Sequence, residues 1–359
     1  MKNIIRTAYR FFTGVTTLAA LPFRGRAQKI AVSYGGARSG DYGGTLVKIR
    51  LLQKHFPERR LGYSLFYLLS NAIYLPQFVI DQIKRSGVPV VFNQNGVFYP
   101  GWYPDRWERE NARMAGVHAA ADYVFYQSEF CKRCAEKFLG RRSGKSEVLF
   151  NAVDTGHFAP SKSVSGFPYT FLVTGKFGET TAYRLSSSVA GLAAARRGGL
   201  DIRLTIAGLI DRNVEAAIRN EVERLEIQGA VKFIGPYSNV EAPNVYRSAN
   251  AYLMTKYNDP CPNTVLEAMA SGLPILYSDS GGVPEQVGAQ AGIALPMPET
   301  FETDLAPNAE EIARGMAQVI KDHDRMAVAA RARAVERFDL AHWLARHEAI
   351  FRVLLGMTQ

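Results

Sequence analysis

Two carboxylates, Asp259 and Glu267, lie eight positions apart around the predicted start of a short helix. The stretch that contains them, DPCPNTVLE, has two stiffening prolines and a side chain that can cap the helix, Asn263 or Thr264. Gly272 is expected to end the helix. The first turn of a helix offers free N–H groups to an anion, whereas acids suit vicinal hydroxyls. A ligand that has both an anionic group and vicinal hydroxyls is typical of a nucleotide sugar. The alternative interpretation is that this stretch is a capped helix with ordinary surface acids and binds no ligand.

Length and charge limit the classes of protein that this chain can represent. Its 359 residues suggest two domains, and its three cysteines argue against a disulfide framework. The net charge is +10, but residues 1–29 contain six Lys or Arg and no acid, so the remainder carries only +4. Such a surplus suits anionic partners. No recognition helix, RNA-binding aromatic signature or zinc-finger spacing is present in the sequence, so nucleic acid is not expected as a partner.

The first 27 residues form a basic and apolar extension. Its apolar run from Phe11 to Phe23 has thirteen residues, too few to span a bilayer as a helix. Three interpretations stay open: a surface anchor, a packed or disordered extension, and a secretory signal peptide. The anchor is favoured, with residues 1–26 on an anionic membrane surface. We therefore expect a cytoplasmic protein, peripheral at the inner face of the membrane.

Apolar strands alternate with amphipathic helices over two parts of the chain. Residues 28–160 form the first predicted domain and residues 169–337 the second, separated by a Pro-, Ser- and Gly-containing linker at 161–168. Residues 338–359 form a final amphipathic helix. The alternation predicts an α/β protein with two doubly wound parallel sheets. In such sheets ligands bind at the carboxyl ends of the strands.

Several motifs resemble those of the family-four glycosyltransferases. The run DPCPNTVLEAMASGLPILYSDSGGVPE is similar to the family's E-x7-E signature, its small-rich helix and its GG-x-P-E loop. The runs ADYVFYQSEF, VLFNAVDTGHFAP and FLVTGKF are similar to other family motifs in the same order. The likeness covers roughly residues 30–351. It implies the GT-B fold: two Rossmann-like domains facing each other across a cleft, with a C-terminal helix crossing back to the first.

The resemblance implies roles for four charged side chains. Glu267 matches the acid that holds the donor ribose. Asp259 stands where the family has a glutamate that contacts the donor sugar, one methylene longer. Lys176 matches a base that faces the donor diphosphate, and Arg184 is the nearest candidate for a second one. These four residues are the predicted catalytic set.

The remaining candidates bind the donor mainly through the backbone. In the second half these are Gly175 and the helix start Asn263, Thr264 and Val265. In the first half, Gly35 and Gly36 belong to the loop GGARSGDYGG, which is open enough for backbone to approach a ligand. Asn95 ends the strand VPVVFNQ, at a position where many family members have histidine. A general-base role is therefore not expected for it.

The resemblance also implies the reaction. A hexosyl group would move from a nucleotide-diphosphate sugar to a hydroxyl of a glycan or lipid-linked glycan, with retention at the anomeric carbon. Neither a cofactor nor a metal is expected, and the pathway would be envelope polysaccharide or glycolipid synthesis. Two alternatives stay open: a nucleotide-sugar epimerase on the same fold, and a non-catalytic subunit that binds the donor, which Asp259 in place of glutamate makes conceivable.

Overall fold

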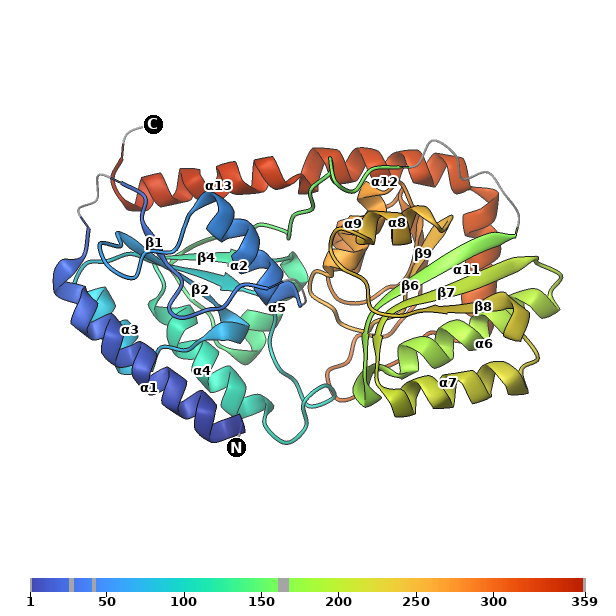
Figure 1. The fold of residues 1–359 in the computed structure, drawn as a ribbon, viewed down its shortest axis with the longest axis horizontal. Helices are drawn as coiled ribbons and strands as arrows, with labels where there is room; N and C mark the ends of the chain where they lie inside the picture. Colours follow the sequence, from blue (N-terminus) through green and yellow to red (C-terminus); the bar gives the residue numbers. More distant parts are fainter. Residues whose placement is uncertain (1, 26–28, 41–42, 161–167, 358–359) are drawn as a thin grey trace. The chain divides into compact units, whose positions relative to one another are not determined.

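The computed structural model describes residues 2–25, 29–40, 43–160 and 168–357 (Figure 1). The chain forms two compact units, the first from residues 1–150 and 341–359 and the second from residues 151–340. Both are α/β units with parallel sheets, as predicted. Most of the predicted linker, residues 161–168, lies outside the described residues.

The first unit is built on a five-stranded parallel sheet in which the strands follow chain order. Its strands are β1 (Val32–Ser33), β2 (Leu65–Leu69), β3 (Val90–Gln94), β4 (Tyr123–Tyr126) and β5 (Lys145–Val148). Its helices are α1 (Lys2–Ala20), α2 (Gly44–His55), α3 (Gln77–Arg85), α4 (Trp107–Ala120), α5 (Glu129–Phe138) and α13 (Leu340–Leu354), with short 3-10 turns η1 (Leu21–Phe23) and η2 (Ser70–Ala72).

Alternate side chains of these strands face opposite layers of helices. Phe66, Phe92 and Val124 belong to a core that also contains buried residues of α3 and α4. On the other face, Tyr67 and Phe125 contact α13. The sheet is therefore covered on both faces, which parallel sheets require.

Helix α13 completes the first unit from the far end of the chain. His347 Nε2 lies 2.9 Å from the hydroxyl of Tyr67, and both side chains are buried. The Phe351 ring meets the Phe56 ring edge-on at 5.1 Å. Burial lowers the pKa of His347 to about 3, so this imidazole is neutral at ordinary pH. The predicted return of the last helix to the first unit is confirmed.

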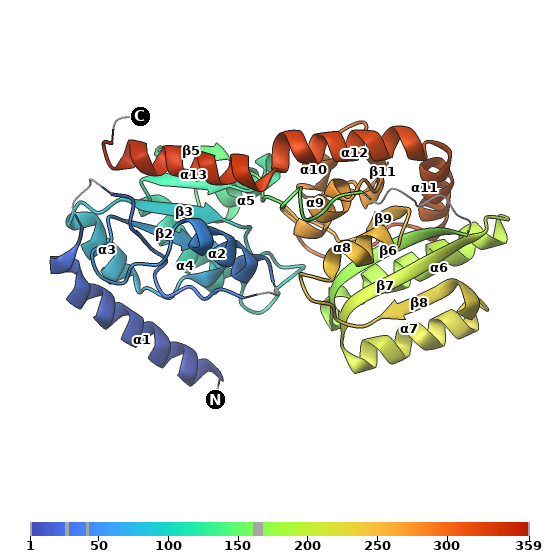
Figure 2. The same cartoon turned by 45° about the horizontal axis from the view of Figure 1, so that its top comes forward.

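The second unit has a six-stranded parallel sheet of order β11-β10-β9-β6-β7-β8. Its strands are β6 (Tyr169–Phe177), β7 (Ile202–Ile210), β8 (Val231–Ile234), β9 (Ala251–Met254), β10 (Ile275–Ser278) and β11 (Gly292–Leu295). Its helices are α6 (Tyr183–Arg197), α7 (Arg212–Arg224), α8 (Ala242–Arg247), α9 (Asn263–Ala270), α10 (Val283–Val287), α11 (Ala309–Lys321) and α12 (His323–Phe338), with η3 (Glu179–Thr181) and η4 (Gln228–Ala230). Figures 1 and 2 show α6 and α7 on one face of this sheet and α9 and α12 on the other.

Residues 151–160 were predicted in the first domain, but the compact second unit includes them. The Asn151 amide donates to the Cys261 carbonyl at 2.8 Å. The Arg331 guanidinium donates to the carbonyls of Thr155 and Phe158 at 3.0 and 2.8 Å. These bonds to loop and helix carbonyls explain why the second unit starts about ten residues before the predicted linker.

We predict that Phe351→Ala destabilises the first unit. Removing a buried phenylalanine costs about 3–5 kcal/mol, from lost burial and the cavity that remains. Urea unfolding of the full chain should show this loss in the transition of the first unit. Val353→Ala is the matched control, because Val353 lies on the same helix and is 58% exposed. Equal losses in both variants would contradict the packing described for α13.

Candidate functional site

The second unit contains a topological switch point between β6 and β9. From β6 the chain runs outward through β7 and β8, and then returns to β9 on the other side of β6. The connections that follow β6 and β9 therefore diverge at their carboxyl ends. Crevices at such points are where open α/β sheets bind ligands. Of the predicted donor residues of this unit, Gly175 and Lys176 lie at the carboxyl end of β6, and the others follow β6 or β9.

Arg184 is a buried cation at this edge of the sheet, only 4% exposed. Its Nη2 donates to the Thr174 carbonyl at 3.3 Å, and its Cζ lies 4.9 Å from the centre of the Phe177 ring. Its Nε has no hydrogen-bond partner within the described part of the chain. A side chain at Gly175 would put its Cβ 2.9 Å from Nη1. Glycine at 175 thus leaves space beside the guanidinium.

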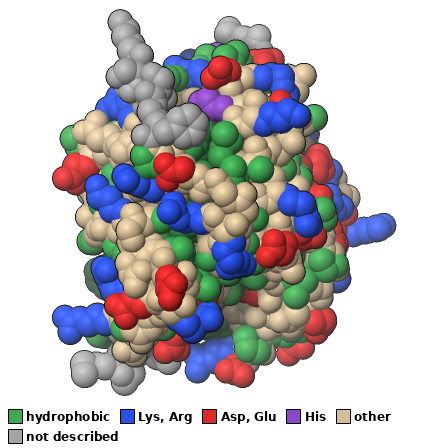
Figure 3. Space-filling model, turned by 90° about the vertical axis from the view of Figure 1, so that its right-hand side faces the viewer, with side chains coloured by type: hydrophobic (Ala, Val, Ile, Leu, Met, Phe, Trp, Pro, Cys, Tyr) green, Lys and Arg blue, Asp and Glu red, His purple; other side chains and the backbone are tan. Residues whose placement is uncertain are grey.

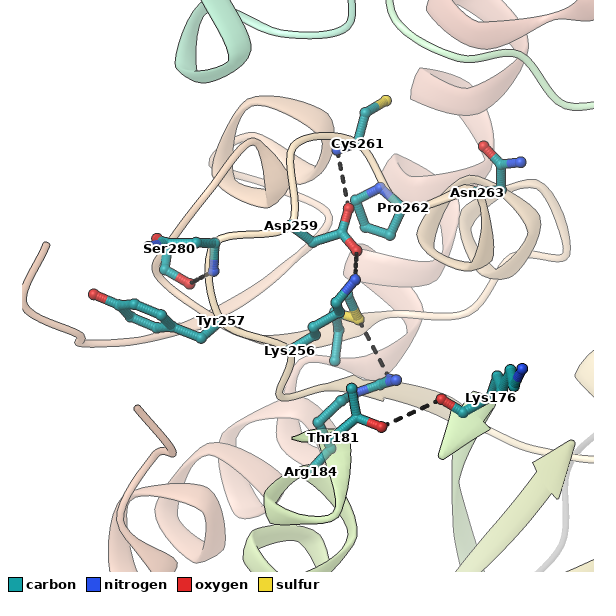
Figure 4. A network of polar contacts seen from close by, with 12 residues as sticks. Lys176, Thr181, Arg184, Lys256, Tyr257, Asp259, Cys261, Pro262, Asn263 and Ser280 are labelled. Atoms are coloured by element: carbon teal, nitrogen blue, oxygen red, sulfur yellow. Dashed lines mark hydrogen bonds and ion pairs between the residues drawn. The ribbon is translucent and has the colours of Figure 1, made fainter. Parts of the chain in front are cut away.

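Lys176 differs from Arg184 in being exposed. Its carbonyl accepts a hydrogen bond from the Thr181 hydroxyl at 3.4 Å, but its ammonium extends away from Arg184 (Figure 4). The two predicted cations are therefore not equivalent. Arg184 is held by the protein, whereas Lys176 is a solvated charge that can reorient.

Asp259 is engaged by two donors within its own loop. Its Oδ2 accepts from the Lys256 ammonium at 2.7 Å, and its Oδ1 accepts from the Cys261 N–H at 3.1 Å (Figure 4). The sequence interpretation missed Lys256. A lysine three residues before the acid, in a short loop, is the signal that could have identified it. A carboxylate offers about four lone-pair sites, so Asp259 retains capacity for sugar hydroxyls.

The glycine pair after β10 supports the Asp259 loop. Gly282 N–H donates to the Asp259 carbonyl at 2.9 Å. Gly281 has a φ of 69°, and a Cβ there would lie 2.4 Å from the same carbonyl oxygen. Only glycine fits this close approach. The GG turn therefore fixes the backbone that carries Asp259.

Helix α9 begins differently from the prediction. Its N-cap is Pro262, and no side chain caps it, so the predicted cap by Asn263 or Thr264 is wrong. The Asn263 side chain accepts from the Asn151 amide at 2.8 Å instead. The Val265 N–H bonds to the Pro262 carbonyl at 3.2 Å. Of the three predicted backbone donors, Val265 is thus already paired within the protein.

Glu267 lies one turn into α9 and contacts a group of tyrosines. The Tyr246 hydroxyl donates to its Oε2 at 2.6 Å, and Tyr246 and Tyr252 both contact the Thr174 hydroxyl. Desolvation by these surroundings raises the pKa of Glu267 to about 7, although the hydrogen bond from Tyr246 opposes the rise. Glu267 is only partly buried. A ligand can therefore reach a carboxylate whose charge is costly to maintain.

The candidates of the first unit lie near the carboxyl ends of its strands. Gly35 and Gly36 follow β1 with φ of 59° and 82°; Cβ atoms there would meet Leu68 and Thr13 at 2.6 and 2.7 Å. Tight packing thus gives these glycines a structural reason beyond ligand approach. Asn95 follows β3.

The Asn95 side chain belongs to a polar network. Its Oδ1 accepts from Lys48 and Gln127 at 2.8 and 2.5 Å, and its Nδ2 donates to Asn71 at 2.6 Å. These contacts hold the amide in one orientation.

Part of the second unit is similar to known proteins. Residues 183–335 match the family model of glycosyl transferases group 1. The chain is 24% identical over 212 residues to D-inositol 3-phosphate glycosyltransferase of Pseudarthrobacter chlorophenolicus, covering 55% of this chain and 50% of the relative. It is 27% identical over 279 residues to a GDP-mannose-dependent alpha-mannosyltransferase of Mycobacterium tuberculosis, covering 71% and 64%. The match spans about half the length of the first of these relatives.

Solved structures show the fold. Sucrose-phosphate synthase of Thermosynechococcus elongatus superposes with a TM-score of 0.69 at 16% identity, over 86% of this chain and 76% of that one. The Anabaena protein HepE in complex with UDP-glucose gives 0.64 at 17% identity, over 85% and 82%. The fold is GT-B. The predicted GT-B fold is therefore confirmed; retention of configuration and an envelope substrate stay predictions.

We predict that Glu267→Gln changes the pH dependence of stability. Because the folded-state pKa of Glu267 is raised to about 7 from 4.5, the folded chain binds the proton more tightly than the unfolded chain. The stability contributed by this tighter proton binding is fully present below about pH 4.5 and is lost as pH rises through 7. Wild type should therefore lose on the order of 1–3 kcal/mol relative to Glu267→Gln between about pH 5 and pH 8.

Denaturant unfolding of both proteins at the two pH values measures this difference. Asp279→Asn is a control for the loss of an acidic charge in the same unit, since Asp279 is exposed. If the free energy of unfolding changes equally with pH in wild type and in Glu267→Gln, Glu267 is not desolvated in the folded chain.

Proposed function

We propose that this chain transfers a hexosyl group from a nucleotide-diphosphate sugar to a hydroxyl of a glycan or lipid-linked glycan, with retention at the anomeric carbon. The observation that carries the proposal is Arg184, a buried guanidinium at the switch point of a group 1 glycosyl transferase region. A buried cation with an unpartnered Nε is suited to a diphosphate, because phosphate oxygens accept charge-assisted hydrogen bonds. The named activities of the relatives, which all transfer or join sugars, support the same class.

Each residue of the proposed site has a separate task. Arg184, the mobile Lys176 and the start of α9 would stabilise the negative charge that develops on the departing diphosphate. Glu267 would accept hydrogen bonds from the ribose hydroxyls, and Asp259 from the donor sugar. No protein nucleophile is invoked: the acceptor oxygen would attack from the face that the diphosphate leaves, and a leaving phosphate oxygen would take its proton. The protein would contribute orientation and charge stabilisation.

The proposal includes no metal or cofactor and no nucleic-acid partner. It places the protein in the cytoplasm, at the inner face of the membrane, in the synthesis of an envelope polysaccharide or glycolipid. The basic residues of the segment 1–29 support this location. Gly35, Gly36 and Asn95 are proposed to contact ligands from the first unit.

Calorimetric titration with UDP, GDP and ADP tests the donor site. We expect one of them to bind, and Arg184→Met to weaken that binding by roughly ten- to a hundredfold, as expected for a lost hydrogen bond to a charged group. Arg203→Met is the control, because Arg203 is exposed at the amino end of β7. If no nucleotide binds to wild type, the proposed donor site is wrong.

The stereochemistry of transfer needs its own measurement. With the nucleotide sugar identified, proton NMR of the first-formed product should show the anomeric configuration of the donor. Asp259→Ala should lower turnover while the nucleotide diphosphate still binds, because Asp259 is assigned to the sugar.

The same assay separates the alternatives. Exchange of donor epimers without an acceptor would indicate an epimerase. Nucleotide binding without any turnover, in wild type and Asp259→Ala alike, would indicate a non-catalytic subunit.

A further inference from the structure

Helix α1 has one face that packs on the first unit and an opposite face that is exposed. The inner face packs on the first unit: the Tyr9 hydroxyl donates to the Gly36 carbonyl at 2.7 Å, and Arg10 donates to the Ile73 carbonyl at 3.2 Å. Thr13 is buried, and a Cβ on Gly14 would lie 3.2 Å from Pro76. These contacts attach α1 to the rest of the first unit, so α1 is an integral helix of that unit.

The outer face of α1 is exposed and contains no charged residue. At helical spacing it presents an apolar strip made of Ile5, Ala8, Phe11, Phe12, Val15 and Ala19, all of them exposed. Phe11 and Phe12 are 72% and 65% exposed. A surface helix of a globular protein normally carries polar residues on its outer side. A contiguous apolar surface of this kind marks an interaction site.

The apolar strip continues beyond the helix. The Phe23 carbonyl accepts from the Gly62 N–H at 3.1 Å, so the segment after α1 lies beside the turn at 59–62. Phe23 and Leu61, on these two neighbouring segments, are both exposed. The apolar surface therefore draws on two separate parts of the first unit.

Basic side chains accompany this apolar surface. The exposed ones on or beside α1 and the 59–62 turn include Arg6, Arg24, Lys29, Arg38, Arg59 and Arg60. The sequence of residues 1–29 contains no acid. By contrast, basic and acidic side chains are intermixed over the face drawn in Figure 3. Among the nearby acids, Glu58 is partly buried beside the turn, and Glu110 is paired with Arg113. The exposed phenylalanines and basic side chains are together complementary to an anionic lipid surface.

We infer that α1 and the 59–62 turn form the membrane-docking surface of the first unit, with Phe11, Phe12 and Phe23 entering the headgroup layer of an anionic bilayer. No helix of the described residues is long and apolar enough to cross a membrane, so the contact is interfacial. The hydrogen bond from Tyr9 to Gly36 joins this surface to the glycine loop after β1. The inference rests on the proposed function and deepens it, because it says which surface brings the first unit to the membrane that holds a lipid-linked acceptor.

Vesicle co-sedimentation of the full chain tests the inference. Wild type should bind vesicles of equal parts phosphatidylcholine and phosphatidylglycerol, bind phosphatidylcholine alone more weakly, and lose binding as salt is raised. Phe11→Ser with Phe12→Ser should lower partitioning at least about tenfold, because two exposed aromatic side chains no longer enter the interface. Arg59→Gln with Arg60→Gln should reduce the preference for the anionic lipid.

The control is Val240→Ser with Val328→Ser, which removes two apolar side chains of the second unit that are at least as exposed as Phe11 and Phe12, and should leave partitioning unchanged. Nucleotide binding should be unaffected in all of these variants, so failure here is distinguishable from failure of the donor site. The inference is overturned if wild type does not bind anionic vesicles or if the Phe11 and Phe12 variant binds as well. A dimer of wild type that this variant dissociates, without vesicle binding, would assign the surface to a second copy of the chain.

Discussion

The burial of one guanidinium constrains much of the second unit. Arg184 lies where β6 ends, under a position that must be glycine, with an aromatic ring on one side and a carbonyl on the other. Its own carbonyl accepts from Thr255 at 3.1 Å, which ties α6 to the residue after β9. Taking a cation out of water is costly unless its hydrogens are paired. An anionic ligand that supplies the missing acceptor would therefore stabilise the fold and be bound by the same contacts.

The two acids of the site experience different environments. Asp259 accepts hydrogen bonds from an ammonium and from a backbone N–H of its own loop. Glu267 faces phenolic hydroxyls in a desolvated setting, which favours its neutral form. Ribose hydroxyls can donate to Glu267 as Tyr246 does and so favour its ionised form. Asp259 is thus ion-paired with Lys256 within the protein, whereas a bound ligand would help Glu267 to ionise.

The local sequence pattern was sufficient to predict most helices and strands. It was less informative about the contacts between them. The alternation of strands and helices predicted over residues 169–337 is present in the second unit, because periodicity and flanking turn signals agree there. Strand β11 was not predicted, since its four residues have little to distinguish them from a loop. The pairing of Lys256 with Asp259 and the packing of Thr13 on Gly36 depend on backbone positions that a linear pattern does not reveal. The acids and cations could be named from motifs, but their burial could not.

The return of α13 has a consequence for the order of events during synthesis. The second unit is one continuous stretch, so all its strands are available once residue 340 has been made. The first unit begins earlier but needs the last helix to cover Tyr67 and Phe56. When residue 340 has been made, the second unit therefore has every part of its core. At that point the first unit still has an apolar face that α13 has not yet covered. The unit that is translated first is the one that finishes folding last.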